Sequence, residues 1–440
     1  MILGGSHTAV RPREVVFVAS SIAVLAALAY ATTLTLPFIS DDYVQILLGR
    51  EYGPVSKWGA LAGDALYRCR ATSIAFTYWL ERAAGVTSFY YNLASLLLHI
   101  ANSLLVFALG FWRPVGWRAA ALAAGFFAVC QRHSEAVVWF AAVPELLVFF
   151  FALASFLLWI RSLESRSPAL LYAGSMACYL LALLSKESAV VVGPLCALAV
   201  FAHPGRPFRR LWALAPFAAI ALLYFVAGYS ARATHLHYND GTFSLHAPFV
   251  ETLLRSIGGL LWVWGAAALP LLFAKAARPW RMAVIVAGAW MVLTLLPYSF
   301  LTYMPRVPSR HTYLASVGLS LIVAVGLLAF REYARKWNRA WLVPAVACVI
   351  VVQQCGHLWT IKRRQYAERA RPTEELISLA GKGAKEIRAK CFPYSPLVGE
   401  LALQFRLSAE ARPVLVLAPE AAQDPEAVDL CNKVAHGPRR

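Results

Sequence analysis

Long apolar blocks alternate with short polar segments over the first 358 residues of the chain. A helix needs roughly 20 apolar residues to cross the hydrocarbon core of a bilayer, with a tolerance of a few residues. By this criterion the pattern predicts eleven membrane-spanning helices, at 15–38, 91–111, 118–132, 144–160, 169–184, 187–202, 211–229, 255–274, 282–301, 312–330 and 341–358. The sequence therefore predicts an all-α polytopic integral membrane protein.

Two longer segments stand apart from this pattern. The loop at 39–90 mixes aromatic and aliphatic residues with Arg68, Arg70 and Arg82, which is typical of helices lying in the membrane interface. The tail at 360–440 has short apolar strings between charged residues and prolines, which predicts a small α/β appendage. We therefore expect a transmembrane domain at 1–359 and a second domain at 360–440.

The composition also indicates a membrane protein, and it limits the classes of molecule that the chain is expected to bind. The chain is 60% hydrophobic and 15% charged, with a formal net charge of +18. Its basic residues are spread over short loops, as expected for cytoplasmic loops and for contacts with anionic lipid headgroups. Membrane lipids are therefore expected partners, and no nucleic-acid partner is expected.

The basic residues also predict the topology. The N-terminal segment and every second loop after it hold sixteen Arg and Lys residues, whereas the longer loops between them hold ten. The positive-inside rule then places the N-terminus in the cytoplasm and the loop 39–90 outside. An odd number of spans puts the tail outside too, where Cys391 and Cys431 could pair in an oxidising compartment. A cytoplasmic tail is the alternative, because basic residues follow the last span.

The residue types suited to chemistry gather on the predicted outer side. Asp41 and Asp42 follow the first apolar block, where two adjacent carboxylates cost solvation and mutual repulsion. A solvated helix end that merely stops the span is the simpler interpretation. Glu135 is a third catalytic candidate. The candidates for binding the carrier phosphate or the sugar of a substrate are Arg68, Lys186, Glu187, Arg310, His311 and His99.

Each of these candidates also has a structural interpretation. Lys186 and Glu187 lie in a very tight turn between two apolar blocks and could simply pair with each other. Glu135 fits a solvated loop acid, and Arg310 fits an arginine that snorkels to the interface. His99, inside the second apolar block, fits a buried hydrogen-bonded histidine better than a ligand. No cluster has metal-site spacing, so no metal is predicted.

Outer carboxylates, several cations and an apolar surround suit a lipid-linked sugar as substrate. The polyprenyl tail would lie in the membrane, and its phosphate would meet Arg and Lys. A carboxylate would act on the acceptor proton as a general base. A single base implies one displacement with inversion at the sugar carbon, by analogy with inverting glycosidases.

Several short motifs carry a resemblance to a known superfamily over roughly residues 36–320. The motifs are Asp41-Asp42-Tyr43, Tyr67-Arg68, Tyr91-Asn92-Leu93, Leu96 to Asn102, His133 to Val137, Leu184 to Ser188, and Arg310 to Leu314 with Gly318. In this order they resemble the GT-C membrane glycosyltransferases, in particular the protein O-mannosyltransferase-like group. That group includes the transmembrane-and-tetratricopeptide enzymes, but the tail shows no tetratricopeptide repeats.

The resemblance implies roles for individual residues. Asp41, or alternatively Asp42, would be the catalytic base. Lys186, Arg310 and Arg68 would contact the carrier phosphate, although the usual Arg-Pro-Leu reads Arg68-Cys69-Arg70 here. Glu135 would hold acceptor or sugar hydroxyls. No cofactor is required by this scheme, and a divalent cation, used by more distant members, is not assumed.

The sequence thus predicts an inverting, hexosyl- or mannosyltransferase-like enzyme that uses a polyprenyl-phosphate sugar. Its acceptor would be a protein, a lipid or a glycan, and its site would face the periplasm of a bacterial inner membrane. Two alternatives are a transporter or flippase of the same lipid, and a structural subunit in which Asp41 and Asp42 only bind a partner.

Overall fold

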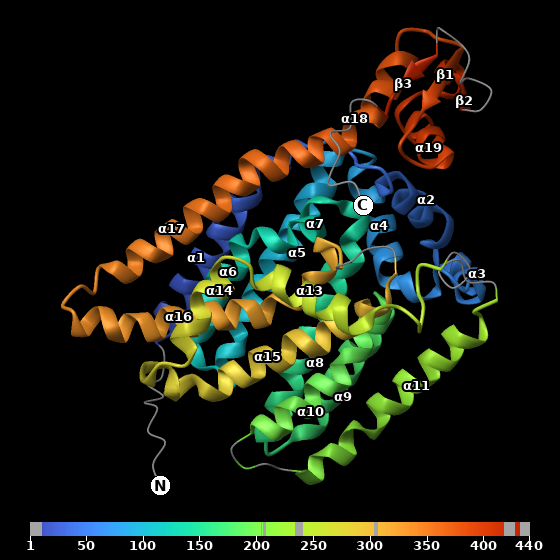
Figure 1. The fold of residues 1–440 in the computed structure, drawn as a ribbon. Coiled ribbons are helices and arrows are strands. Elements are labelled where there is room, and N and C mark those ends of the chain that lie inside the picture. Colours follow the sequence, from blue (N-terminus) through green and yellow to red (C-terminus); the bar gives the residue numbers. More distant parts are fainter. Residues whose placement is uncertain are drawn as a thin grey trace.

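A computed structural model describes residues 11–203, 205, 208–233, 241–302, 307–417 and 427–431. Every apolar block predicted to span the membrane forms helix (Figure 1). These helices are α1 (Pro12–Tyr30), α5 (Ser88–Ala108), α6 (Gly116–Val129), α8 (Val143–Glu164), α9 (Pro168–Leu183), α10 (Val192–Ala202), α11 (Ala215–Ser230), α13 (Phe249–Leu261), α14 (Trp264–Leu272), α15 (Arg281–Leu295), α16 (Ser316–Lys336) and α17 (Leu342–His357).

Not all of these helices are long enough to cross a bilayer. Among the described residues, seven helical segments meet the requirement by length and composition, or eight if α13 and α14 together count as one span. Three shorter apolar helical segments, at Gly116–Val129, Pro168–Leu183 and Glu187–Ala202, complete the set. The chain is an all-α integral membrane protein in which the predicted segments are right and several are shorter than a full span.

The predicted span at 255–274 is not one continuous helix. α13 and α14 meet at 91°. The break falls at Trp262 and Val263, and Val263 adopts a φ of 69°, a left-handed conformation that a β-branched residue rarely takes. The predicted segment at 255–274 is therefore apolar helix on both sides of a break that the apolar pattern does not show.

Three helices form within the segment 39–90: α2 (Asp42–Tyr52), α3 (Trp58–Gly63) and α4 (Ala71–Ala84). α2 lies against α4, and Gln45 donates from Nε2 to Thr77 Oγ1 at 3.0 Å. Gly49 permits this approach, since a Cβ there would lie 3.1 Å from Thr77 Cγ2. The helix pair holds the start of α2, where Asp41 and Asp42 lie, in a defined position.

The tail forms a small α/β domain carried on a long helix. α17 continues through a wider helical turn at Leu358–Lys362 into α18 (Arg363–Ala380). Beyond α18 lie α19 (Pro396–Arg406) and a parallel sheet of order β2-β1-β3, with strands β1 (Glu386–Cys391), β2 (Val414–Leu417) and β3 (Val428–Asp429). The expected boundary at residue 360 thus lies inside continuous helix.

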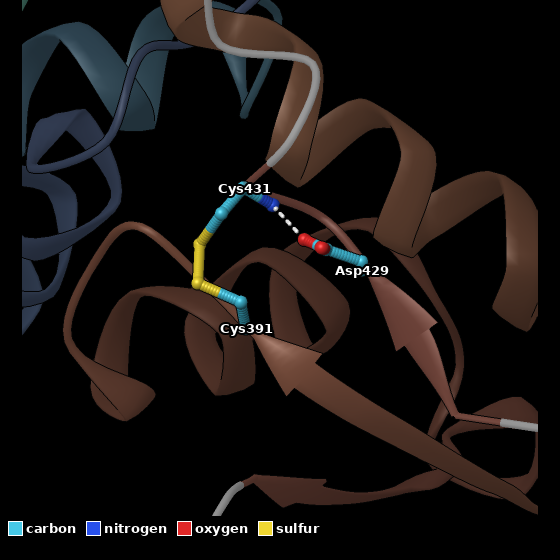
Figure 2. Close-up of side chains that lie close together, drawn as sticks. All are labelled: Cys391, Asp429 and Cys431. Atoms are coloured by element: carbon cyan, nitrogen blue, oxygen red, sulfur yellow. Dashed lines mark hydrogen bonds between the residues drawn. A yellow bond between two sulfur atoms is a disulfide. The ribbon is translucent and has the colours of Figure 1, made fainter. Parts of the chain in front are cut away.

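A disulfide closes this domain. Cys391 at the end of β1 is bonded to Cys431 just after β3, as Figure 2 shows. The backbone N–H of Cys431 also donates to Asp429 Oδ1 at 2.9 Å. The sequence left this pairing open as a possibility, and the structure joins the two cysteines.

The tail domain packs at the end of the bundle where α2 begins (Figure 1). Phe405 of α19 lies 6.4 Å from the ring of Tyr43, and the Arg50 guanidinium lies 4.1 Å above the Phe405 ring. The tail and the Asp41–Asp42 pair are therefore on the same face of the molecule.

Candidate active site

Asp42 clamps the turn that follows α1. Its side chain is only 2% exposed, its Oδ2 accepts from the backbone N–H of Ile39 at 2.8 Å, and its Oδ1 accepts from Ala141 N–H at 2.7 Å. Burial raises the pKa of Asp42 to about 7, although the two backbone donors oppose the rise. Both oxygens are used internally, so this geometry suits a positioning group.

Asp41, its neighbour, is exposed to solvent. Ser40 holds it from one side, donating from Oγ to Asp41 Oδ1 at 3.1 Å, and Ser40 itself has a positive φ of 47°. Trp139 secures the same turn by donating from Nε1 to the Ile39 carbonyl at 3.0 Å. The sequence left the choice between the two acids open, and the structure leaves Asp41 as the accessible carboxylate.

Glu135 joins two arginines from distant parts of the chain. Its Oε1 accepts from the NH1 groups of Arg310 and Arg369, each at 3.2 Å, and its Oε2 accepts from the Arg310 backbone N–H at 3.2 Å. These positive charges hold the pKa of Glu135 below its usual value despite burial. Both guanidinium groups also lie over the Trp139 ring, at 5.0 and 4.8 Å from its centroid.

Lys186 and His311 meet around Glu145 of α8, and all three side chains are buried. Lys186 donates to Glu145 Oε1, and His311 Nδ1 lies 2.5 Å from the same oxygen. Tyr298 donates to Glu145 Oε2 at 3.0 Å and stacks on the His311 ring. Burial lowers the pKa values of Lys186 and His311, the latter to about 4. The predicted phosphate contact of Lys186 would require it to leave this buried pair.

Glu187 and Arg68 have partners of their own. Glu187 accepts from Arg70 at 3.1 Å rather than pairing with Lys186, and it is 55% exposed on its side chain. Arg68 donates from NH2 to the carbonyl of Ala227 at 2.5 Å. The turn between α9 and α10 therefore presents Glu187 outward and Lys186 inward.

His99 lies in the protein core, away from the acidic and basic groups above. One ring nitrogen lies 2.7 Å from the Tyr313 hydroxyl, and the other lies 3.0 Å from the Ala128 carbonyl. It is 0% exposed. This environment is that of a structural histidine, the interpretation that its place in an apolar block favoured over a substrate contact.

Arg369 and Tyr298 are the residues that sequence reasoning missed at this end of the molecule. Arg369 lies on α18, well beyond the last motif of the family resemblance, in a helix rich in other arginines. Tyr298 lies in the short helical turn Leu296–Phe300 that follows α15, and its sequence context is that of an ordinary interfacial tyrosine. They are identified as members of the site by their hydrogen bonds, from Arg369 to Glu135 and from Tyr298 to Glu145.

Within the described ranges, one group of side chains has the types and proximity of a metal site: Cys391, Asp429 and Cys431. The two sulfur atoms form the disulfide of Figure 2, so neither is a thiolate that could bind a metal. These residues therefore do not fit a metal centre.

No protein-family model and no curated protein matches this sequence. Solved structures do resemble it. ArnT from Cupriavidus metallidurans, bound to undecaprenyl phosphate, has a TM-score of 0.53 and 15% identity, and the match covers 91% of this chain and 89% of ArnT. The oligosaccharyltransferase AglB from Archaeoglobus fulgidus, in complex with an inhibitory peptide and a dolichol-phosphate, has a TM-score of 0.53 and 11% identity. That match covers 92% of this chain but only 65% of AglB, slightly under two thirds.

The transmembrane helices of this chain therefore share the fold of these two neighbours, which agrees with the GT-C-like fold expected from the sequence. At these identities the likeness concerns the fold alone.

Proposed function

We propose that this protein is an inverting glycosyltransferase that moves a sugar from a polyprenyl-phosphate carrier to an acceptor. The observation that carries the proposal is the exposed carboxylate of Asp41, fixed by a buried and fully hydrogen-bonded Asp42 at one end of a GT-C fold. A general base needs this combination of access and fixed position.

The surrounding residues suit the other requirements of the reaction. A departing phosphate needs positive charge more than a proton, and planar guanidinium groups supply it with directed N–H donors. Arg310 and Arg369 are such groups. Glu135 holds both of them, which favours a positioning role over the contact with sugar or acceptor hydroxyls expected from the sequence. We propose no cofactor and no divalent cation for this step.

The donor class is supported by the two structural neighbours, whose structures contain undecaprenyl phosphate and dolichol-phosphate. The narrower assignment to the protein O-mannosyltransferase-like group, with a hexose or mannose as the sugar, rests on the sequence motifs. For the acceptor we propose a protein, a lipid or a glycan; the bound peptide in the AglB structure is an example of the first class.

We further propose that the protein lies in a bacterial inner membrane with its N-terminus in the cytoplasm and its site facing the periplasm. The distribution of basic residues supports this orientation. The Cys391–Cys431 disulfide supports it too, since the tail shares a face with Asp41 and disulfides persist in oxidising compartments.

The test is transfer of labelled sugar from polyprenyl-phosphate donors by the purified protein in lipid. Asp41→Asn should lower the rate by about a hundredfold or more at unchanged melting temperature, because the general base is lost. Asp42→Asn should lower both rate and stability, since one backbone N–H of the turn loses its acceptor. Glu51→Gln, an exposed acid on the same helix, is the matched control.

Two results would oppose the proposal. If Asp41→Asn transfers sugar as fast as wild type, Asp41 is not the base. If wild type binds the donor and carries it across the bilayer without releasing sugar, the protein is a transporter or flippase of lipid-linked sugar.

A further inference from the structure

Arg369 is the unexpected member of the charged cluster, because it comes from the C-terminal segment. Within the described residues, Glu135 Oε1 accepts one hydrogen bond from Arg310 and one from Arg369. The side chains of Arg310 and Arg369 are 24% and 31% exposed, whereas that of Glu135 is 13% exposed. The carboxylate thus lies beneath two guanidinium groups that both reach the surface.

The cluster carries more positive charge than its own acid neutralises. Two guanidinium groups and one carboxylate leave a net charge of +1. Each guanidinium has five N–H donors, and the hydrogen bonds to Glu135 use the NH1 group of each. The remaining donors and the excess charge suit an anion with several acceptor oxygens, such as a phosphate monoester or diester.

The cluster also lies beside the proposed base. Trp139 lies under both guanidinium groups, and its indole N–H binds the carbonyl of Ile39, two residues before Asp41. An anion held by the arginines would therefore be close to the turn that presents Asp41.

We propose that Arg310 and Arg369 form a two-arginine clamp for the phosphate of the lipid carrier, so that the C-terminal domain supplies part of the substrate site. The identity of the anion rests on the function proposed above; the clamp itself rests on the contacts of Glu135. Arg369 is the new element, since the sequence motifs end before residue 320.

The docking of the tail sets the position of this arginine. Tyr394, in the tail domain, donates from its hydroxyl to the Arg369 carbonyl, and the Tyr366 and Ser134 hydroxyls lie 3.2 Å apart. α18 is thus tied both to the tail domain and to the segment that carries Glu135. A function for the tail follows from this arrangement, although its sequence contains no recognisable motif.

The experiment measures binding of undecaprenyl monophosphate to the full-length protein in lipid nanodiscs. Arg369→Gln should weaken binding by roughly tenfold or more, as expected when a hydrogen bond to a charged group is lost. Arg369→Lys keeps the positive charge but loses the planar guanidinium group. Its affinity for undecaprenyl monophosphate should therefore lie between those of wild type and Arg369→Gln. Arg371→Gln, an exposed arginine on α18 that pairs with Glu375, is the matched control and should bind like wild type.

Competitors separate a true phosphate site from a general lipid effect. Neutral undecaprenol should bind wild type and Arg369→Gln equally, and phosphatidylglycerol should not compete with undecaprenyl monophosphate. Inorganic phosphate at high concentration should compete in wild type and not in Arg369→Gln. Melting temperatures of all variants establish that the tail domain is folded.

Equal binding of undecaprenyl monophosphate by wild type and Arg369→Gln would overturn the clamp. Loss of neutral undecaprenol binding in Arg369→Gln would overturn it too, because the arginine would then support the lipid groove and not the phosphate. Competition by phosphatidylglycerol would assign the pair to general lipid contact. These results are independent of sugar transfer, so a clamp that binds phosphate in a protein without transferase activity would refute the proposed function alone.

Discussion

At the scale of single residues, two adjacent acids of identical chemistry have different environments. Asp42 is enclosed and bound by two backbone N–H groups, whereas Asp41 faces solvent. The difference arises because the 140–142 segment packs over one carboxylate and not the other. A buried neighbour that fixes the turn and an exposed acid that acts on the substrate make a consistent division of roles.

The buried acid predicts a pH-dependent stability. Because the folded protein raises the pKa of Asp42 from 3.8 to about 7, it binds this proton more tightly than the unfolded chain does. The contribution to the free energy of unfolding is therefore complete below about pH 4 and is lost as the pH rises through about 7. The melting temperature of Asp42→Asn should therefore lack the loss that ionisation of Asp42 causes in the wild type between about pH 4 and pH 7.

Asp41→Asn is the control for that experiment and should keep most of the wild-type pH dependence, since Asp42 stays buried and the charge of Asp41 is a smaller cause of its raised pKa. A wild-type melting temperature that changes between pH 4 and 7 in the same way as that of Asp42→Asn would contradict the assigned pKa direction.

At the scale of elements, the short connection between α9 and α10 sends its two charged residues in opposite directions. Lys186 turns inward to Glu145 on α8, while Glu187 binds Arg70 just before α4. Thr72 reinforces the same contact, donating its backbone N–H to the Leu184 carbonyl at 3.1 Å. The tight turn therefore joins the segment 39–90 to the helix bundle.

The buried pair predicts strongly non-additive substitutions. Lys186→Met or Glu145→Leu alone leaves one buried charge without its partner, which costs about 3–5 kcal/mol of folding free energy. The double variant should be destabilised by much less than the sum, because neither charge then remains. Unfolding midpoints in one detergent measure the cycle, with exposed Lys385→Met as control.

The same variants test the predicted phosphate contact of Lys186. A double variant that is stable and binds undecaprenyl monophosphate like wild type would assign Lys186 to structure. Additive losses of stability, by contrast, would contradict the pairing with Glu145.

At the scale of the whole molecule, a continuous helix connects the bundle with the tail domain. α17 and α18 run from Leu342 to Ala380, and the domain beyond them packs back on α2 (Figure 1). The small domain lies on the face that holds Asp41, Glu135 and the two arginines bonded to Glu135. The tail and the candidate site are therefore expected on the same side of the membrane.

A tail in an oxidising compartment predicts a definite thiol count. The chain has eight cysteines, of which six are free and two form the Cys391–Cys431 disulfide. Protein isolated without reductant and then denatured should take up six alkyl groups by intact mass, and eight after reduction. The Cys391→Ser, Cys431→Ser double variant should take up six in both cases. Eight groups without reduction would oppose the proposed periplasmic orientation of the tail.

The sequence by itself determined which segments are apolar helices, because each block of roughly 20 apolar residues can satisfy its backbone in lipid only as helix. It also predicts that the candidate residues share one side, since loop charge follows the positive-inside rule. The short apolar strings of the tail predicted its α/β nature, whereas the pairing of Cys391 with Cys431 was a possibility that depended on the compartment.

Tertiary structure alone decided which candidates are accessible and which are paired. Asp41 and Asp42 are equivalent in sequence, and only packing against the 140–142 segment separates them. Lys186 contacts Glu145, 41 residues away in the chain, and Arg369 contacts Glu135, 234 residues away. Neither local hydrophobicity nor motif spacing predicts contacts between residues so far apart in the sequence. The break between α13 and α14 was hidden for a related reason: apolar patterning reports where a segment is buried, whereas the direction of the backbone depends on the helices packed around it.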